Sequence, residues 1–364
     1  MQTYIGRLAP SPTGAQHLGN ARTYIIAWLC ARLNGGRLVL RIEDIDTPRT
    51  KPGADQQAID DLKWLGLDWD EGPHVQTKRR HRYQHALQSL IELGLAYPCT
   101  CTRSDIQRAA SAPHETRSAS IAAASRQIVS ETPLYPGTCA TWQMGDPLPV
   151  DRTYCWRFRT RPAGEIIVHD QCLGVTRCDL HRDLGDFPIT RKTQFPRGDH
   201  RGNSLNHPNA DDPMTSPDAA YHLAVVVDDA EMGITHVIRG SDLIASAHRQ
   251  SALFRALGYP VPKFAHVPLV VGTDGRRLAK RHGDTRLATF RELGVSPQAI
   301  VGWALRSVGI LPGPIAGNEP ISAAGALSAL RDNGIEPSSL LANILSAPTI
   351  ISPQEFLNPG DAIS

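Results

Sequence analysis

Four residues near the N-terminus have the types and spacing of a phosphate-binding motif. His17-Leu18-Gly19-Asn20 follows a loop with two prolines, at residues 10–14, and precedes a segment with helical spacing. The first amides of a helix lack partners and its dipole favours an anion, so a phosphate is expected at this point. Gly19 allows close backbone approach, and the imidazole of His17 can donate to phosphate oxygens. The competing interpretation is an ordinary loop histidine beside a packing glycine.

Three cysteines form a second candidate site. Cys99 and Cys101 are separated by one residue, and Cys139 follows a Pro-Gly turn. Structural zinc is four-coordinate and thiolates bind it well, so a zinc site here needs one more ligand. Tyr135, on the turn before Cys139, is the nearest candidate, and His81 or His114 would serve equally well. Alternatively, these are reduced cysteines that pack as small apolar side chains. The remaining four cysteines are scattered and predicted to be structural: Cys30, Cys155, Cys172 and Cys178.

The elements that position the first motif form a predicted βαβ unit. Residues 4–9 are predicted as a strand, residues 18–33 as a helix with apolar side chains at helical spacing, and residues 37–42 as a second strand. Such units open parallel nucleotide-binding sheets, which bind ligands at the carboxyl ends of their strands. Residues 7–11 and 43–46 are therefore expected to lie side by side at the site.

The rest of the chain is less regular. The pattern predicts a possible weak helix within residues 104–132 and an exposed loop over residues 190–218. A buried strand at residues 221–227, a helix at 246–257 and a strand at 264–271 follow. After Asp284 the pattern is helical again. The candidate core positions of that tail are Phe290, Leu293, Ile300, Trp303 and Leu305.

The His17 motif in this context resembles the HIGH motif of the class I aminoacyl-tRNA synthetases. Their second motif, KMSKS, has a counterpart in Arg277-Leu278-Ala279-Lys280-Arg281. The resemblance implies that Lys280 stabilises the charge that grows on the triphosphate during attack at the α-phosphate. Arg277 keeps the charge of the family's first lysine, whereas Ala279 loses a serine hydroxyl. ATP-binding residues are therefore expected to be His17, Gly19, Asn20, Arg277 and Lys280, with Mg²⁺ held mainly by phosphates and water.

Two further segments resemble the glutamyl branch of this family. They are residues 6–14 and 41–46, and Arg239-Gly240-Ser241-Asp242-Leu243 adds a third. Glutamate carries two carboxylates and one ammonium, so its pocket needs two cationic groups and one anionic group. The resemblance implies that Arg7 binds the side-chain carboxylate, Glu43 the ammonium and Arg239 the α-carboxylate. The complete expected glutamate site is Arg7, Leu8, Ala9, Pro10, Ser11, Glu43, Tyr221 and Arg239. Surface ion pairing is the competing interpretation for any one of these residues.

The acceptor follows from a narrower resemblance, to a short glutamyl paralogue without an anticodon-binding domain. Only 81 residues follow Gly283 (364 − 283), too few for a stem-contact region and such a domain. Val225 and the three cysteines also match the paralogue, which implies Cys99, Cys101, Tyr135 and Cys139 as ligands of one structural zinc. The implied partners are ATP, L-glutamate and tRNA(Asp) carrying queuosine, whose base accepts the glutamate.

Three alternatives remain open. Residues 285–310 resemble the stem-contact helices of the full-length enzyme, which keeps a truncated glutamyl-tRNA synthetase in view. A nucleotide-binding relative without activity is opposed by the intact His17, Glu43, Arg239 and Lys280. An unrelated nucleotidyltransferase would share the His17 motif but would not need the glutamate-type pocket. A Walker-type phosphate loop is missing, so kinase or ATPase chemistry has no support.

The predicted fold class is α/β: a Rossmann-like class I synthetase catalytic domain with a zinc-containing insertion and a short helical C-terminal region. The expected divisions are two halves of the catalytic domain at 1–96 and 219–283, a zinc-binding and acceptor-type insertion at 97–189, the exposed loop at 190–218, and a helical stem-contact-like tail at 284–364.

Composition adds few constraints. The net charge of +2 does not by itself indicate nucleic acid, and the basic run at residues 78–82 is interpreted as a solvated helix face. No stretch approaches the ~18 apolar residues of a membrane helix. Residues 1–5 have neither the basic region nor the apolar core of a signal peptide, so a cytoplasmic protein is expected. No coiled-coil pattern or obvious interface stands out, and a monomer is expected.

Overall fold

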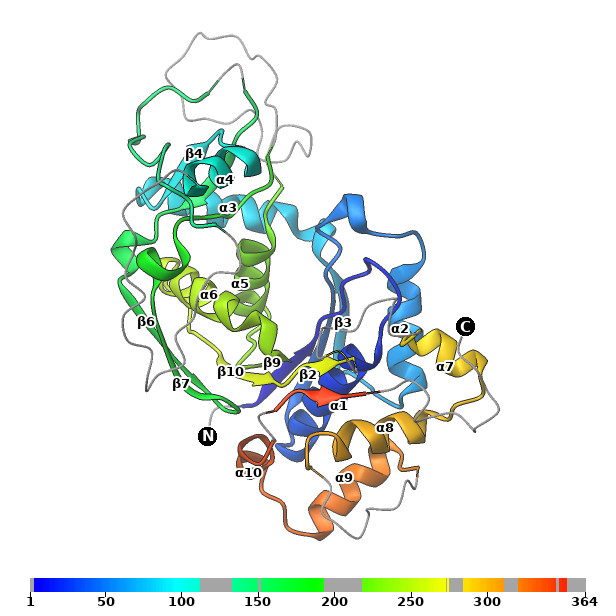
Figure 1. Ribbon diagram of the computed structural model, residues 1–364. Helices are drawn as coiled ribbons and strands as arrows, with labels where there is room; N and C mark the ends of the chain where they lie inside the picture. Colours follow the sequence, from blue (N-terminus) through cyan, green and yellow to red (C-terminus); the bar gives the residue numbers. More distant parts are fainter. Residues whose placement is uncertain are drawn as a thin grey trace.

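The N-terminal part of the chain forms the predicted parallel βαβ unit, in a computed structural model (Figure 1). β1 (Ile5–Leu8), α1 (Leu18–Leu33) and β2 (Arg37–Ile42) match the expected elements closely. β3 (Glu71–Val75) extends the sheet in the order β1-β2-β3, all parallel. The structure describes residues 3–111, 133–149, 152–192, 218–272, 274, 284–310, 320–344 and 347–351.

The second and third strands are each followed by a helix. α2 (Ala54–Trp64) follows β2, and α3 (Arg80–Glu92) follows β3. A small antiparallel sheet then joins β4 (Ala96–Cys99), β5 (Cys155–Phe158) and β8 (Phe187–Pro188) in the order β4-β5-β8. α4 (Arg103–Ser111) follows β4, and it accounts for the start of the helix predicted within residues 104–132; residues 112–132 lie outside the described part.

A second sheet carries the other half of the site. β6 (Glu165–Asp170) and β7 (Gly174–Asp179) form an antiparallel hairpin, and β9 (His236–Gly240) and β10 (Lys263–Val267) complete the order β7-β6-β10-β9. β9 lies against β1, where Thr235 N–H donates to Ile5 O at 2.9 Å. The parallel strands of the two sheets, β1 and β2 in the first and β9 and β10 in the second, therefore present their carboxyl ends to a common region, as expected for this fold class.

Two predicted strands need correction. The segment at residues 221–227 is the start of a helix, α5 (Tyr221–Glu231), not a strand. Its side chains at 223–229 are all buried, and an apolar run buried on every side has no periodicity that separates a helix from a strand. The strand predicted at 264–271 is divided into β10 and β11 (Val270–Val271) by Pro268, which has no N–H for a ladder. The helix predicted at 246–257 is confirmed as α6 (Ile244–Ala256).

The tail is helical, as predicted, and it packs against the first helix of the chain. It contains α7 (Leu287–Glu292), α8 (Pro297–Arg306), α9 (Ala323–Asp332) and α10 (Pro337–Ala342). α8, α9 and α10 contact α1 in one hydrophobic cluster (Figure 1). Phe290, Ile300, Trp303 and Leu305 are buried as expected, but Leu293 is 39% exposed because it lies just beyond the last turn of α7.

A short strand near the end of the described residues was not predicted. β12 (Thr349–Ile350) pairs in parallel with β11, so the tail returns to the strand that precedes residues 275–283. Among the described residues, no helix has the length and apolar character needed to span a membrane. Of the loop predicted at 190–218, only residues 190–192 and 218 are described.

Candidate active site

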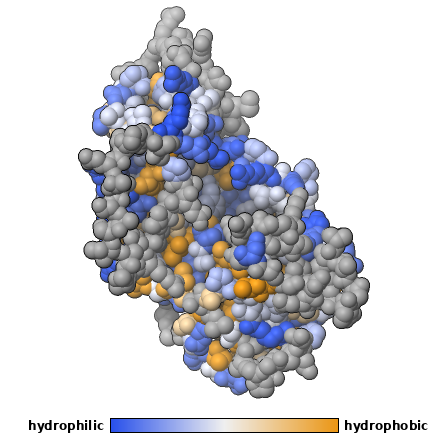
Figure 2. Space-filling model, in the orientation of Figure 1, coloured by the Kyte–Doolittle hydropathy of each residue, from blue (hydrophilic) through white to orange (hydrophobic). Residues whose placement is uncertain are grey.

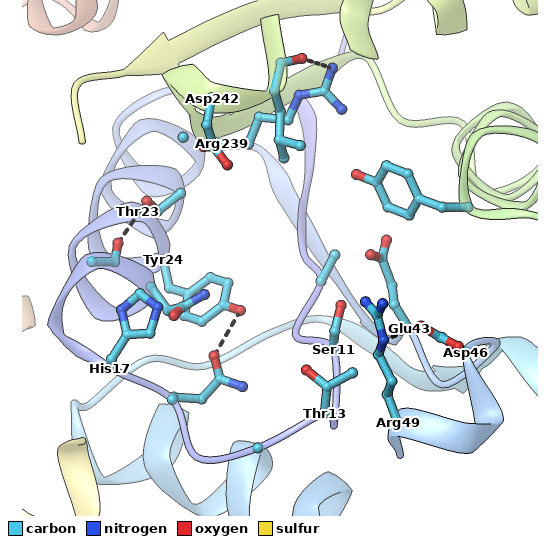
Figure 3. Close-up of a pocket in the computed structure, with 18 of the residues that line it drawn as sticks. Ser11, Thr13, His17, Thr23, Tyr24, Glu43, Asp46, Arg49, Arg239 and Asp242 are labelled. Atoms are coloured by element: carbon cyan, nitrogen blue, oxygen red, sulfur yellow. Dashed lines mark hydrogen bonds and ion pairs between the residues drawn. The ribbon is translucent and has the colours of Figure 1, made fainter. Parts of the chain in front are cut away.

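A large pocket opens at the carboxyl ends of the parallel strands. It measures about 1020 Å³, at the upper end of the range for small-molecule sites. Its walls come from the ends of β1, β2 and β9 and the starts of α1 and α5. Figure 3 shows His17 and Tyr24 of α1 on one side, Ser11, Glu43 and Asp46 on the other, and Arg239 above them. The space-filling view shows polar side chains in the hollow between the two parts of the molecule (Figure 2).

The start of α1 explains why a glycine follows His17 by two residues. His17 is the N-cap of the helix, and its ring turns back over the first turn. A Cβ on Gly19 would lie 3.2 Å from two atoms of that ring, so a larger residue would displace the imidazole. His17, Gly19 and Asn20 all line the pocket. The backbone of this turn is fixed by the tail, since Leu18 N–H donates to Thr285 O at 3.1 Å.

The opposite wall is organised by a guanidinium that does not itself face the pocket. Arg41 is fully buried, and it donates to Glu43 Oε1 at 2.9 Å and to Asp229 Oδ1 at 2.7 Å. Its Nε lies 3.8 Å from Asp228 Oδ2. Burial raises the pKa of Glu43, while Arg41 and then Arg7 oppose that shift by favouring the carboxylate. Glu43 is thereby held in one orientation at the pocket wall.

Two other arginines lack such a close carboxylate. Arg7 donates to Ile238 O at 3.2 Å, and its Nε lies 3.6 Å from Asp229 without a hydrogen bond. Arg239 donates to an imidazole, an amide oxygen and a carbonyl, at His266, Gln250 and Leu243. Both guanidinium groups are buried and both line the pocket. Arg7, Arg239 and Glu43 therefore place two cationic groups and one carboxylate near the ends of β1, β9 and β2, while other charged side chains, among them Asp46 and Arg49, also line the pocket.

The predicted residues are brought together with a few exceptions. Ala9, Ser11, Tyr221 and the groups above line one pocket, and burial raises the pKa of Tyr221, so its hydroxyl stays protonated. Leu8 instead packs in the core, and Pro10 contributes its carbonyl, which accepts from Glu43 N–H at 3.0 Å. Arg277 and Lys280, with the rest of residues 275–283, lie outside the described part of the chain.

Sequence reasoning missed the role of several residues in this region. Arg41 belongs to residues 41–46, and its signal was an arginine within a largely apolar strand, residues 37–42. Asp228 and Asp229 directly follow the segment at residues 221–227 that was predicted as a strand, but they belong to the helix that aims them at Arg41. Tyr24 lies within the predicted helix at residues 18–33 but was not predicted to line the site. Its hydroxyl donates to Gln16 Oε1 at 3.2 Å, and both residues line the pocket.

The basic run at residues 78–82 is not a simple solvated face. Arg79 donates to Asp228 and to Glu231, both at 2.7 Å, and only 19% of its side chain is exposed. Arg82 reaches Glu231 at 3.3 Å, and Arg80 lies 3.3 Å from Asp218. The run therefore fastens α3 to α5, behind the pocket.

The three cysteines predicted to bind zinc converge. The thiol sulfurs of Cys99, Cys101 and Cys139 all lie within 4.8 Å of one another, a group compatible with a metal ion. The hydroxyl of Tyr135 is 3.4 Å from Cys99 Sγ and 3.8 Å from Cys101 Sγ. His81 is not in this group, and His114 lies outside the described residues.

Charge near Cys99 favours a metal-ligating thiolate. A hydrogen bond with Cys155, opposed by burial, helps to lower the pKa of Cys99 to about 4, whereas burial raises that of Cys101 to about 11. Cys155, one of the four cysteines predicted to be structural, is the cross-strand partner of Cys99. Arg157 lies 4.1 Å from the centre of the Tyr135 ring and lowers the pKa of Cys99 further. A bound divalent cation would supply the charge that lets the remaining thiols ionise.

Comparisons with known proteins agree on the type of catalytic domain. The family described as tRNA synthetases class I (E and Q), catalytic domain, matches residues 5–199 and 214–328. The chain is 52% identical, over 86% of its length and 87% of the relative, to a Glutamyl-Q tRNA(Asp) synthetase of Rhodopirellula baltica. It is 44% identical to a second protein of that name, from Symbiobacterium thermophilum, over 85% of this chain and 88% of the other.

Longer proteins match over only part of their length. The chain is 38% identical to Glutamate--tRNA ligase 2 of Halorhodospira halophila, over 82% of this chain but 56% of the relative. The crystal structure of a glutamate tRNA ligase from Elizabethkingia meningosepticum, in complex with its amino acid, superposes with a TM-score of 0.69. That likeness covers 97% of this chain and 68% of the other at 23% identity, and shows the fold alone.

The buried position of Arg41 predicts a large effect on stability. Arg41→Leu leaves three buried carboxylates without their shared cation, so the free energy of unfolding should fall by about 3–5 kcal/mol. Arg37→Leu, on the same strand, removes an ion pair whose arginine is 52% exposed, and should cost about 1 kcal/mol or less. Urea denaturation of the two variants measures the difference. Equal losses would contradict the assigned role of Arg41.

Proposed function

We propose that this chain, which belongs to the class I tRNA synthetase family for glutamate and glutamine, activates L-glutamate with ATP and transfers it to the queuosine base of tRNA(Asp). The observation that carries the proposal is the match, nearly end to end, with two proteins named for this reaction. Glutamate–tRNA ligases match only about half of their own length, so a truncated enzyme of that type fits less well. The intact pocket opposes an inactive relative.

The pocket charges support glutamate as the amino acid. We assign Arg7 to the side-chain carboxylate, Glu43 to the ammonium and Arg239 to the α-carboxylate, with the Tyr221 hydroxyl beside them. This distribution neutralises each charge of glutamate with a group that is already buried and oriented. Because Arg41 holds Glu43 and the Ile238 carbonyl holds Arg7 before the ligand arrives, little ordering cost accompanies binding.

The proposed activation is a single in-line displacement at the α-phosphate of ATP. An oxygen of the α-carboxylate attacks the α-phosphate of ATP, the bond to the bridging oxygen breaks, and pyrophosphate leaves with its electrons. His17 at the start of α1 is assigned to the phosphates, and Lys280 to the charge that develops on them. Catalysis then depends on positioning and charge stabilisation. Magnesium, when bound with ATP, supplies charge neutralisation at the phosphates.

In the second step a hydroxyl of the modified base attacks the carbonyl carbon of the adenylate. An ester forms, AMP leaves, and the hydroxyl proton passes to the surrounding groups or solvent. We further propose one structural zinc ion held by Cys99, Cys101, Cys139 and the oxygen of Tyr135. The convergent thiols and the lowered pKa of Cys99 support this ligand set.

The acceptor can be tested directly. Purified protein, ATP and labelled glutamate should transfer label to tRNA(Asp) that contains queuosine, and not to tRNA(Asp) that lacks it. Filter binding of precipitated RNA measures the transfer, with tRNA(Glu) as the parallel substrate. Label on tRNA(Glu) alone would replace this proposal by the truncated glutamate ligase.

Removal of the Lys280 ammonium should affect chemistry more than binding. Lys280→Ala is expected to slow glutamate-dependent ATP–pyrophosphate exchange about 100-fold or more, because the charge on the leaving phosphates loses its partner. The glutamate KM should change little. Lys263→Ala, which removes an exposed ammonium on β10, is the matched control. Normal exchange by Lys280→Ala would remove this lysine from the mechanism.

The zinc proposal predicts a defined metal content. Wild-type protein should contain one zinc per chain by elemental analysis, and Cys101→Ser should lose it. Cys172→Ser, outside the three-thiol group, should keep it. Tyr135→Phe retains the ring that packs on Arg157 but lacks the oxygen, so it should bind zinc more weakly. Wild-type protein without zinc would exclude the site, and an unchanged affinity in Tyr135→Phe would exclude the phenolic ligand.

A further inference from the structure

Arg239 is held by neutral groups on three sides. Its Nη1 donates to Gln250 Oε1 at 2.7 Å, its Nη2 to Leu243 O at 3.3 Å and its Nε to His266 Nε2 at 3.1 Å. The guanidinium also lies over the ring of Phe264, with 5.2 Å between its central carbon and the ring centre. A guanidinium has five N–H donors, so two remain for a ligand. None of its three hydrogen bonds is to a carboxylate.

His266 links this arginine to a carboxylate deeper in the sheet. It is the direct cross-strand neighbour of Arg239 in the β9–β10 pair, and it is fully buried. Its Nδ1 lies 2.5 Å from Asp170 Oδ2. Because arginine can only donate, Nε2 must be the unprotonated nitrogen, and the single ring proton is on Nδ1, directed at Asp170. Burial lowers the pKa of His266, which keeps the imidazole neutral although the bond to Asp170 opposes that shift.

Asp170 is itself anchored by backbone donors. It ends β6, and its Oδ1 accepts from the N–H groups of Cys172 and Leu173 at 3.0 and 2.9 Å. The backbone N–H of His266 lies 3.1 Å from the same oxygen. Burial alone would raise the pKa of Asp170, but these donors and the imidazole hold it below its ordinary value. The anion therefore stays charged, one imidazole away from the guanidinium.

We infer that His266 is a positioning residue for the substrate-binding arginine, which it orients through a neutral acceptor while it keeps the charge of Asp170 at a distance. A carboxylate placed directly against Nε would form a strong ion pair and compete with the substrate carboxylate for the same cation. An apolar side chain would leave the Nε–H donor of Arg239 unpaired and remove one of the three hydrogen bonds that orient the guanidinium. The imidazole avoids both outcomes. This inference rests on the proposed glutamate activation, with Arg239 as the group that binds the α-carboxylate.

Two amide substitutions separate orientation of Arg239 from packing of the sheet. The carboxamide of His266→Gln reaches the position of Nε2 and can accept from Arg239. That of His266→Asn reaches only the position of Nδ1, so it keeps a donor for Asp170 but offers Arg239 nothing. The glutamate KM in ATP–pyrophosphate exchange should rise about tenfold or more in His266→Asn and about threefold or less in His266→Gln. The ATP KM should stay within about twofold in both.

The outcomes are distinguishable. Equal glutamate KM values in the two variants, or a parallel rise in the ATP KM, would overturn the inference. Wild-type protein without glutamate-dependent exchange would instead overturn the proposed function. If His266→Asn does not fold, ¹⁵N NMR of histidine-labelled wild-type protein still decides, with His266→Gln used to assign the resonance. The inference requires a protonated Nδ1 and an unprotonated Nε2, and the opposite tautomer would contradict it.

Discussion

The buried contact of Arg41 with the carboxylates of Glu43, Asp228 and Asp229 is the interaction on which the site depends. Arg41 and Glu43 belong to β2 and its end, whereas the two aspartates belong to α5, almost 190 residues later (|i−j| = 188 for Arg41 and Asp229). Such a cluster is costly to desolvate, so it contributes through placement more than through net stability. It fixes the distance between the two halves of the fold, and hence the width of the pocket between Glu43 and Tyr221. Arg79, Gln76 and Tyr83 all donate to Asp228, which leaves this carboxylate no freedom to turn toward a ligand.

The same arrangement recurs across the pocket with the charges reversed. Behind one wall, Arg41 of β2 holds the Glu43 carboxylate at the pocket. Behind the other wall, Asp170 of β6 acts through His266 of β10 on the guanidinium of Arg239 on β9. The anchoring charge touches the pocket-facing group directly in the first case and is separated from it by an imidazole in the second, and this difference has a physical reason. In the proposed assignment Glu43 binds a small ammonium, and direct contact with Arg41 favours its carboxylate form against the effect of burial on its pKa. In the same assignment Arg239 binds a carboxylate that also reacts, so it benefits from an undiminished positive charge. Both arrangements restrict the rotation of Glu43 and Arg239, so these side chains are already oriented before the ligand binds.

Local signals in the sequence were enough to predict the helices and strands whose ends are marked by glycine or proline. α1 ended at Leu33, as predicted, directly before Asn34, Gly35 and Gly36, and the carboxyl ends of β1 and β2 met as parallel pairing requires. The errors came where tertiary burial overrides local preference. Val225 to Val227 favour a strand intrinsically, yet they lie in a helix covered on all sides. Arg41 was visible as an arginine in an apolar strand, but its partners are distant in sequence, and only the fold brings them together. The Asp170–His266–Arg239 chain was hidden for the same reason, since its members come from three strands in different segments.

The tail is part of the catalytic structure and not an appendage to it. Arg22 of α1, one turn beyond the His17 motif, is 1% exposed and donates to Thr349 Oγ1 of β12 at 2.7 Å, and it also donates to Pro268 O. Its burial lowers its pKa to about 10, which still leaves it charged at neutral pH. Because β12 pairs with β11, this one guanidinium connects α1, the strand before residues 275–283 and the final described strand. A change in the tail at Thr349 can thus reach the side of the pocket that His17 lines through a single buried side chain. The C-terminal helices, which cover the far side of α1, therefore support the start of the same helix on which His17 depends.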